Sequence, residues 1–170
     1  MLGRKRVPAS LRAELDADER VLGWGTTASG DVVAATNLGL WWPEHPPRRI
    51  AWHLIDRAAW TEAGLSVVEA DVVDDLLLLD RPARVVALAE EGKLPAAVRR
   101  RVEASVARTI EVMTSAGAAL VVGRRVPGRD GLVWWARPPR GAAVDEEVRT
   151  ELEVVVKRLR IQTTAALEQL

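Results

Sequence analysis

Short apolar segments, separated by glycines, prolines and acidic residues, fill the first half of the chain. Several of them alternate apolar with polar residues, and this period of two is typical of β-strands. Gly23 and Gly25 flank Trp24, which indicates a bulge or the close approach of another strand at that point. The expected strands cover residues 20–26, 31–36, 38–42, 48–52 with a continuation at 57–62, 65–70, 76–79 and 83–89.

The period then changes to that of a helix. Val98, Val102 and Val106 recur every four positions behind Pro95, a residue that favours the first turn, so a helix is expected from Pro95 to about residue 107 or a little beyond. Two more strands, 118–126 and 132–136, flank the turn sequence PGRDG. Asp145 is a good N-cap for a last helix. The apolar stripe of that helix is expected to comprise Val148, Leu152, Val155, Leu159, Ala166 and Leu170.

Seven short strands followed by a helix resemble the order of a bacterial pleckstrin-homology-like (PH-like) domain. The segments VVAATNLGLWW, RRIAWHLIDRAAW and GKLPAAVRRRVEASV carry this resemblance. The whole layout, including the hairpin VGRRVPGRDGLVWW, also resembles a group of actinobacterial PH-like proteins of unknown function. The resemblance implies an α+β fold: a seven-stranded antiparallel barrel with a capping helix at 11–113, and an appended β-hairpin and long C-terminal helix at 114–170, packed on the barrel.

The amino-acid composition argues against several classes of function. The chain has 170 residues with 24 basic and 24 acidic side chains, so bulk attraction to nucleic acid or to an anionic membrane is not expected. No stretch approaches the length of a membrane-spanning helix, and stable membrane insertion is not expected. The chain has no cysteine, which excludes disulfides and thiolate chemistry and is compatible with a cytoplasmic protein.

Motifs for catalysis, metals and cofactors are weak. His45 and His53 are the only histidines and make a poor metal site, so no metal is expected. The glycines of GWGTTASG match no nucleotide-binding motif, and no serine lies in a hydrolase motif. The sequence therefore predicts neither an enzyme nor a bound cofactor. Five acidic residues that lack the spacing of a calcium loop are interpreted as a solvated turn: Glu69, Asp71, Asp74, Asp75 and Asp80.

Arginines gather near the second hairpin, where Arg124 and Arg125 are consecutive. Such a group of arginines is able to bind nucleic acid or lipid headgroups. The zero net charge instead favours the interpretation that the arginines lie on solvated faces and pair with carboxylates. In PH domains that bind phosphoinositides, the first hairpin loop carries basic residues. The corresponding loop here, 27–30, has no lysine or arginine, and lipid headgroup binding by that route is not expected.

Two tryptophan pairs, Trp41-Trp42 and Trp134-Trp135, are the most unusual feature. Neighbours on a strand point to opposite faces, so one member of each pair should be core and the other should face outward. The outward ring is covered by the last helix, is covered by a partner chain, or forms a binding patch. We therefore expect a non-catalytic scaffold or protein-interaction module, with a partner protein or a second copy. The alternative is a small-ligand or lipid-binding domain that uses the barrel mouth or a basic patch.

Overall fold

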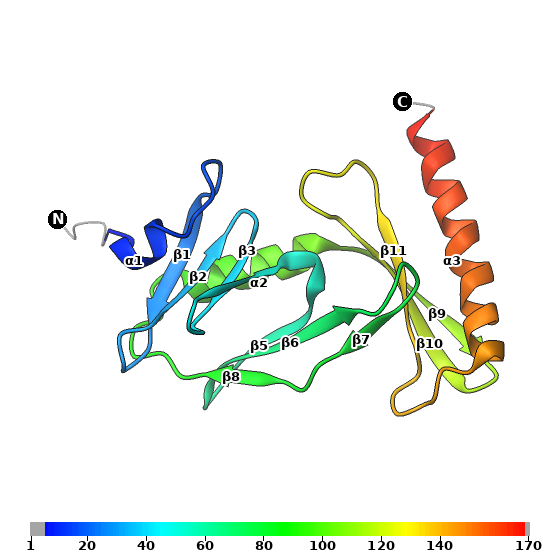
Figure 1. Ribbon diagram of the computed structural model, residues 1–170, viewed down its shortest axis with the longest axis horizontal. Coiled ribbons are helices and arrows are strands. Elements are labelled where there is room, and N and C mark those ends of the chain that lie inside the picture. Colours follow the sequence, from blue (N-terminus) through cyan, green and yellow to red (C-terminus); the bar gives the residue numbers. More distant parts are fainter. Residues whose placement is uncertain (1–5, 169–170) are drawn as a thin grey trace. The chain divides into compact units, whose positions relative to one another are not determined.

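The computed structural model describes residues 6–168, which form an α+β fold (Figure 1). In this part of the chain the strands make three antiparallel sheets, accompanied by three α-helices. The helices are α1 (Ala9–Arg12), α2 (Leu94–Ser105) and α3 (Glu146–Leu167), with a 3-10 turn η1 (Trp52–Leu54). The strands are β1 (Val21–Thr26), β2 (Val32–Thr36), β3 (Gly39–Trp42), β4 (Arg48–Ala51), β5 (Ile55–Thr61), β6 (Gly64–Val72), β7 (Leu78–Asp80), β8 (Arg84–Val86), β9 (Val106–Thr114), β10 (Gly117–Arg124) and β11 (Val133–Arg137).

The α+β class expected from the sequence is confirmed, but the expectation of one seven-stranded barrel is wrong. Strands β1 to β4 form one meander, and the turn η1 separates it from a second sheet built on β5, β6, β7 and β8. Strand β6 is nine residues long; it pairs with β5 and, in addition, with two further strands. Its first half pairs with β8, where Leu65 lies opposite Val86. Its second half pairs with β7, where Ala70 lies opposite Asp80. The sheet therefore branches instead of closing into a single barrel.

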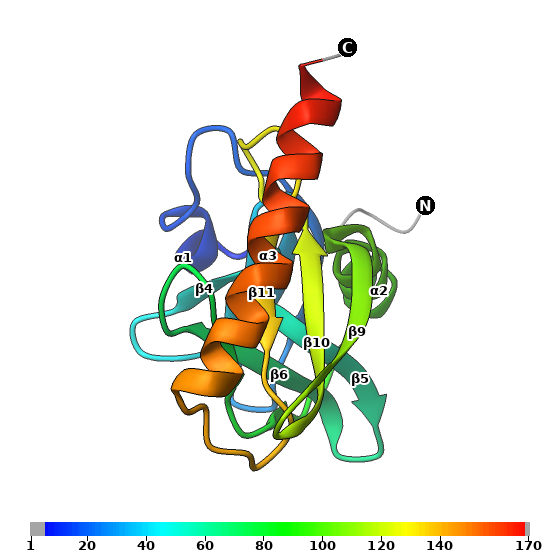
Figure 2. The same ribbon diagram turned by 90° about the vertical axis from the view of Figure 1, so that its right-hand side faces the viewer.

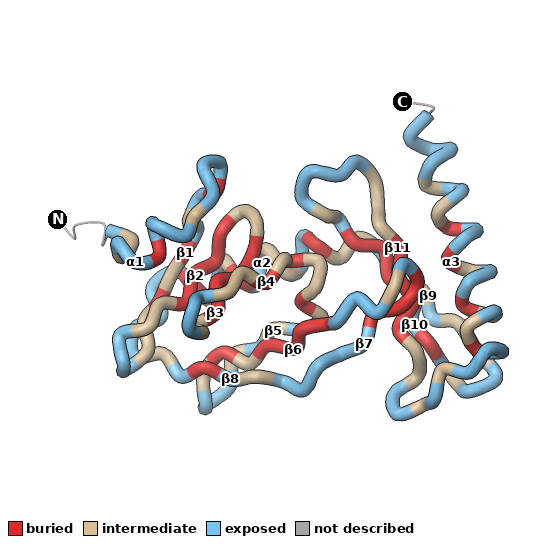
Figure 3. The backbone as a smooth tube through the Cα atoms, in the orientation of Figure 1, coloured by how far each residue is buried: buried red, intermediate tan, exposed pale blue. Residues whose placement is uncertain are grey.

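The described chain divides into two compact units, and the boundaries fall inside β6 and α2. Unit 1 runs to Val68 and includes Ala83–Val102; unit 2 comprises Glu69–Pro82 and the chain from Glu103 onward. The core of unit 1 gathers apolar side chains from both of its sheets and from α2: Val33, Leu40, Trp42, Ile50, Trp52, Ile55, Leu65, Val67, Val86, Leu94 and Val98. Val98 is buried as predicted for the apolar face of the helix, but Val102 is half-buried and Val106 belongs to β9, so the predicted stripe is only partly confirmed. Figure 3 shows the buried positions concentrated on β2 and β3.

Strand β1 bulges between Val21 and Gly23, where its register against β2 shifts. A Cβ at Gly23 would lie 2.6 Å from the carbonyl oxygen of Lys93, and one at Gly25 would lie 2.4 Å from that of Glu90. Both glycines therefore permit a neighbouring backbone segment to approach β1. The predicted bulge is confirmed, and a backbone segment does approach these glycines, but it is the turn before α2 and not another strand.

The helix predicted to pass residue 107 ends at Ser105, and β9 takes its place from Val106 to Thr114. The expected hairpin is thus a three-stranded sheet in the order β11-β10-β9. Figure 2 shows α3 lying across this sheet. The core of unit 2 lies between them and is built from Leu76, Leu77, Ala119, Val121, Trp134, Ala136, Val148, Leu152, Val156 and Leu159.

Helix α3 begins as predicted. The Asp145 carboxylate accepts a hydrogen bond of 2.9 Å from the backbone N–H of Val148, which is the expected N-cap. Val148, Leu152 and Leu159 are buried as predicted. Val156 is also fully buried, whereas Val155 is only half-buried and Ala166 is exposed, so the predicted stripe is partly wrong. The predicted position Leu170 lies outside the described residues.

Candidate functional site

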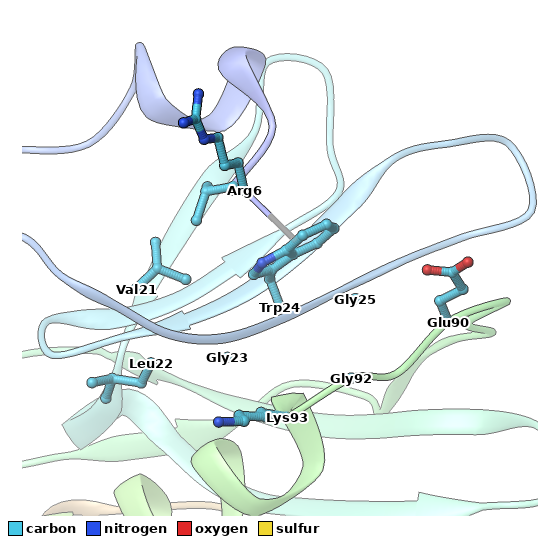
Figure 4. Close-up of a pocket in the computed structure, with 10 residues that line it drawn as sticks. Arg6, Val21, Leu22, Gly23, Trp24, Gly25, Glu90, Gly92 and Lys93 are labelled. Carbon is cyan, nitrogen blue, oxygen red and sulfur yellow. The ribbon is translucent and has the colours of Figure 1, made fainter. Parts of the chain in front are cut away.

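Unit 1 contains a pocket of about 610 Å³ beside β1 (Figure 4). Five consecutive residues of β1, from Val21 to Gly25, form one wall. The segment before α2 forms the opposite wall, and the chain that leads into α1 contributes a third side. The complete lining is Arg6, Val7, Val21, Leu22, Gly23, Trp24, Gly25, Glu90, Gly92 and Lys93.

The pocket exists because the segment that precedes α2 runs along β1. The backbone N–H of Thr26 donates to the carbonyl of Glu90 at 2.9 Å, and the carbonyl of Thr26 accepts from the N–H of Ala89 at 2.8 Å. Beyond this bridge the segment turns at Gly92, whose φ of 53° is one that glycine adopts readily. The chain then enters α2 beside Gly23. The side chains of Trp24 and Leu22 are left facing the space above this segment (Figure 4).

The pocket wall is apolar where β1 meets the N-terminal segment. Val7, Val21 and Trp24 pack on a small cluster whose centre is Leu11 of α1. The guanidinium of Arg12 holds the segment in place by donating to the carbonyl of Val7 at 3.0 Å. Because the indole and the two valines are anchored in this way, the wall is preformed.

Three ionisable side chains lie at the pocket rim: Arg6, Glu90 and Lys93, all exposed. Lys93 belongs to the part of the segment beside Gly23, and Glu90 to the part beside Gly25. The lining thus combines an apolar wall with charged groups at the entrance, which suits binding of an amphipathic ligand.

The tryptophans singled out from the sequence lie elsewhere, and all four are buried. In unit 1 the indole N–H of Trp41 donates to the carboxylate of Glu19 at 2.9 Å. The guanidinium of Arg84 lies 5.0 Å from the ring centroid of Trp42. Arg84 also bonds to Glu44, and this hydrogen bond is the main cause that holds the pKa of Glu44 below its usual value.

In unit 2 the indole N–H of Trp134 donates to the hydroxyl of Thr163 on α3 at 2.8 Å, and Trp135 is 8% exposed. Arg124 is buried and donates to the hydroxyl of Ser105 at 3.1 Å. Arg125 is exposed and donates to the carbonyl of Ala104 at 3.3 Å. None of the six predicted site residues lines the pocket, and the two tryptophan pairs belong to different units.

Three members of the acidic group that we interpreted as a solvated turn, Asp71, Asp75 and Asp80, are exposed as expected, whereas Glu69 is buried. The group is also paired with arginines of unit 2. Arg81 bridges Glu69 and Asp71. Asp80 pairs with Arg137 at 2.9 Å, and Asp74 with Arg149 at 2.8 Å. Among the described residues, no three histidine, cysteine or acidic side chains come together in a way that would hold a metal ion. Within the same residues, no helix combines the length and the apolar character needed to cross a membrane.

Comparison of the chain with protein-family models, with curated proteins and with solved structures found no match in any of the three.

The pocket itself was not predicted from the sequence. The pattern around Gly23 and Gly25 predicted that another backbone segment would approach β1, but it did not show which segment. The partner is about 65 residues away in the chain and is brought there only by the fold.

Proposed function

We propose that unit 1 is a non-catalytic ligand-binding module of PH-like organisation, with the pocket beside β1 as its site. Three features support the PH-like part of the proposal. The eight strands β1 to β8 all precede α2, which agrees with the strands-then-helix order that the resemblance implies, although the resemblance implies seven strands. Leu94 and Val98 of α2 are buried in the core that the two sheets share. The bridge between Thr26 and Glu90 joins the first strand to the segment after the last one.

The pocket is the observation that carries the binding function. Its volume falls in the range of about 300–1,000 Å³ that is typical of small-molecule sites. An apolar wall with a few charged groups at the rim is also typical of such sites. The ionisable groups of the lining are one carboxylate and two cations, and these residue types bind and orient a ligand.

A neutral apolar probe tests this function. The full chain is titrated with the naphthalene dye Prodan, whose emission increases in apolar surroundings. Leu22 lines the pocket and is 39% exposed, so Leu22→Trp should fill the space and weaken dye binding about tenfold. Leu79 is 41% exposed on β7, a strand of unit 2, and does not line the pocket, so Leu79→Trp is the matched control.

Equal dye binding by the wild type and both variants would contradict the assignment of the pocket as the site. Failure of the wild type to bind the dye would contradict the function.

A second candidate function, protein interaction with a second copy of the chain, is favoured by a different observation. Met113 on β9 is 72% exposed and Leu120 on β10 is 39% exposed. The register pairs Met113 with Ala118 and Glu111 with Leu120, so Met113, Ala118 and Leu120 share the sheet face that points away from the core of unit 2. The exposed Glu111 lies on the same face opposite Leu120, so these three residues form a small apolar patch that surrounds one carboxylate, and exposed apolar patches mark contact surfaces.

A further inference from the structure

We propose that the ligand of the pocket beside β1 is an apolar organic acid, with its negative group held on the Lys93 side. This inference rests on the function proposed for unit 1 and adds the charge of the ligand to it.

The charged residues are ordered along β1. Gly23 faces the backbone of Lys93, and Gly25 faces that of Glu90. Two strand positions separate these glycines, which corresponds to about 7 Å. Figure 4 shows Lys93 on the side of Leu22, with Glu90 on the other side of Trp24. The cation and the carboxylate therefore occupy different ends of the pocket, and a ligand that carries one charge has a preferred orientation.

Positive potential dominates at the Lys93 end. Lys93 immediately precedes α2, a helix of twelve residues whose first turn contains no acidic side chain. The N-terminus of a helix carries a positive partial charge, which adds to that of the ammonium group. Arg6, the other cation of the lining, lies across Trp24 from Lys93 (Figure 4), so it makes the lining as a whole more positive without adding to the Lys93 end. An anionic group is therefore attracted to this end and repelled from the other.

The apolar wall of the pocket indicates that the rest of the ligand is apolar. Val21, Leu22 and Trp24 present aliphatic and aromatic surface. Transfer of an alkyl or aryl group onto this surface from water is favourable by about 25 cal/mol for each Å² removed from water. A free acid enters a pocket of this size as a whole molecule, whereas the headgroups of a flat bilayer do not bring their alkyl chains to it.

Three ligands with the same chain test the inference: decanoate, decanol and decylamine, each titrated into the full-length protein by calorimetry. We expect decanoate to bind roughly tenfold more tightly than decanol, and decylamine to bind most weakly. Lys93→Glu should reverse the order of the acid and the amine and leave decanol unchanged. Lys157, an exposed lysine on α3, lies in unit 2, so Lys157→Glu should leave all three affinities unchanged.

The outcomes separate the two proposals. Equal binding of the three ligands, or an equal effect of Lys93→Glu on all of them, would overturn the charge assignment and leave the ligand-binding function in place. Failure of every ligand to bind, decanol included, would overturn the function as well. Co-sedimentation with phosphatidylglycerol vesicles without binding of free decanoate would overturn the inference in favour of a membrane headgroup.

Discussion

Glu19 is a buried carboxylate that joins several elements of unit 1. One of its oxygens accepts hydrogen bonds from the hydroxyl of Thr36 at 2.5 Å and from the indole of Trp41 at 2.9 Å. The other accepts from the guanidinium of Arg49 at 2.6 Å. Asp16 and Glu19 together hold the pKa of Arg49 above its usual value, and the hydrogen bond that Arg49 donates to Asp16 is the larger cause. A charge in this position is compatible with burial because each of its oxygens has a donor.

The two carboxylates that share Arg49 differ in burial, and this gives a prediction at the scale of single residues. The side chain of Glu19 is fully buried, whereas that of Asp16 is 57% exposed. Glu19→Gln leaves the half-buried guanidinium of Arg49 and two buried donors without the charge they face, and should lower the free energy of unfolding by about 3 kcal/mol. Asp16→Asn removes a solvent-screened partner and should cost less than about 1 kcal/mol. Urea unfolding of both variants measures the difference, and the reverse order would contradict it.

At the scale of elements, β9 shows how a helical pattern ends as a strand. Val98, Val102 and Val106 follow one spacing of four, which is why the predicted helix extends too far. Val106, Ile110 and Val112 also fit a period of two, and the segment is rich in β-branched residues. Pairing with β10 at eight positions decides between the two periods, because it gives hydrogen-bond partners to the backbone groups of β9 that face β10.

The loop between β6 and β7 is attached to the first turns of α3 by Asp74. Its carboxylate accepts from the backbone N–H groups of Leu76 at 2.8 Å and Leu77 at 2.9 Å, and from the guanidinium of Arg149 at 2.8 Å. Burial raises the pKa of Asp74, but these three donors outweigh burial and hold the pKa below its ordinary value of 3.8. The carboxylate therefore stabilises the folded state only while it is ionised.

This lowered pKa gives a pH dependence with a definite sign. At pH 7 the interaction contributes fully to stability, and as the pH falls below 3.8 the unfolded chain takes up the proton first, so the contribution is lost through the folded pKa. Asp74→Asn keeps an oxygen for Leu76 and Leu77 but removes the charge that faces Arg149. The difference in unfolding free energy between wild type and Asp74→Asn should shrink between pH 7 and pH 3. The exposed Asp130→Asn is the control, and a difference of equal size at both pH values would contradict the prediction.

At the scale of the whole molecule, the apolar patch of Met113, Ala118 and Leu120 predicts self-association. We expect light scattering over a dilution series to show a dimer that dissociates on dilution, and we expect Met113→Glu to be monomeric throughout. Ile161 on α3 is 61% exposed and lies outside the patch, so Ile161→Glu should associate like the wild type. Equal masses for the wild type and Met113→Glu would contradict this role for the patch.

Much of the fold was predictable because local patterns determine elements. The strands up to β8, the start of α2 near Pro95 and the cap at Asp145 follow from alternation, proline and a side-chain acceptor, each of which acts within a few residues. The sheet arrangement was not predictable in this way. Alternation along β6 does not reveal that one half pairs with β8 and the other with β7, because the residues that decide this pairing lie in other parts of the chain.

The candidate site was the least predictable part. The paired tryptophans and arginines are conspicuous in the sequence, but Trp41 and Trp134 bury their rings and use their N–H groups internally. A residue type shows what a side chain is able to do, and its burial depends on neighbours that are distant in sequence.

The amino-acid sequence by itself determined the α+β class, most of the strands and the two glycines that admit a second backbone segment to β1. These properties depend on periodicity and on the space that each residue occupies. Only the tertiary structure decided that Glu90–Lys93 is that segment, that Trp24 and Lys93 border one pocket, and that the acidic residues after β6 pair with arginines. Such pairings join residues far apart in the chain, and they form only when the burial of a shared core brings their elements together.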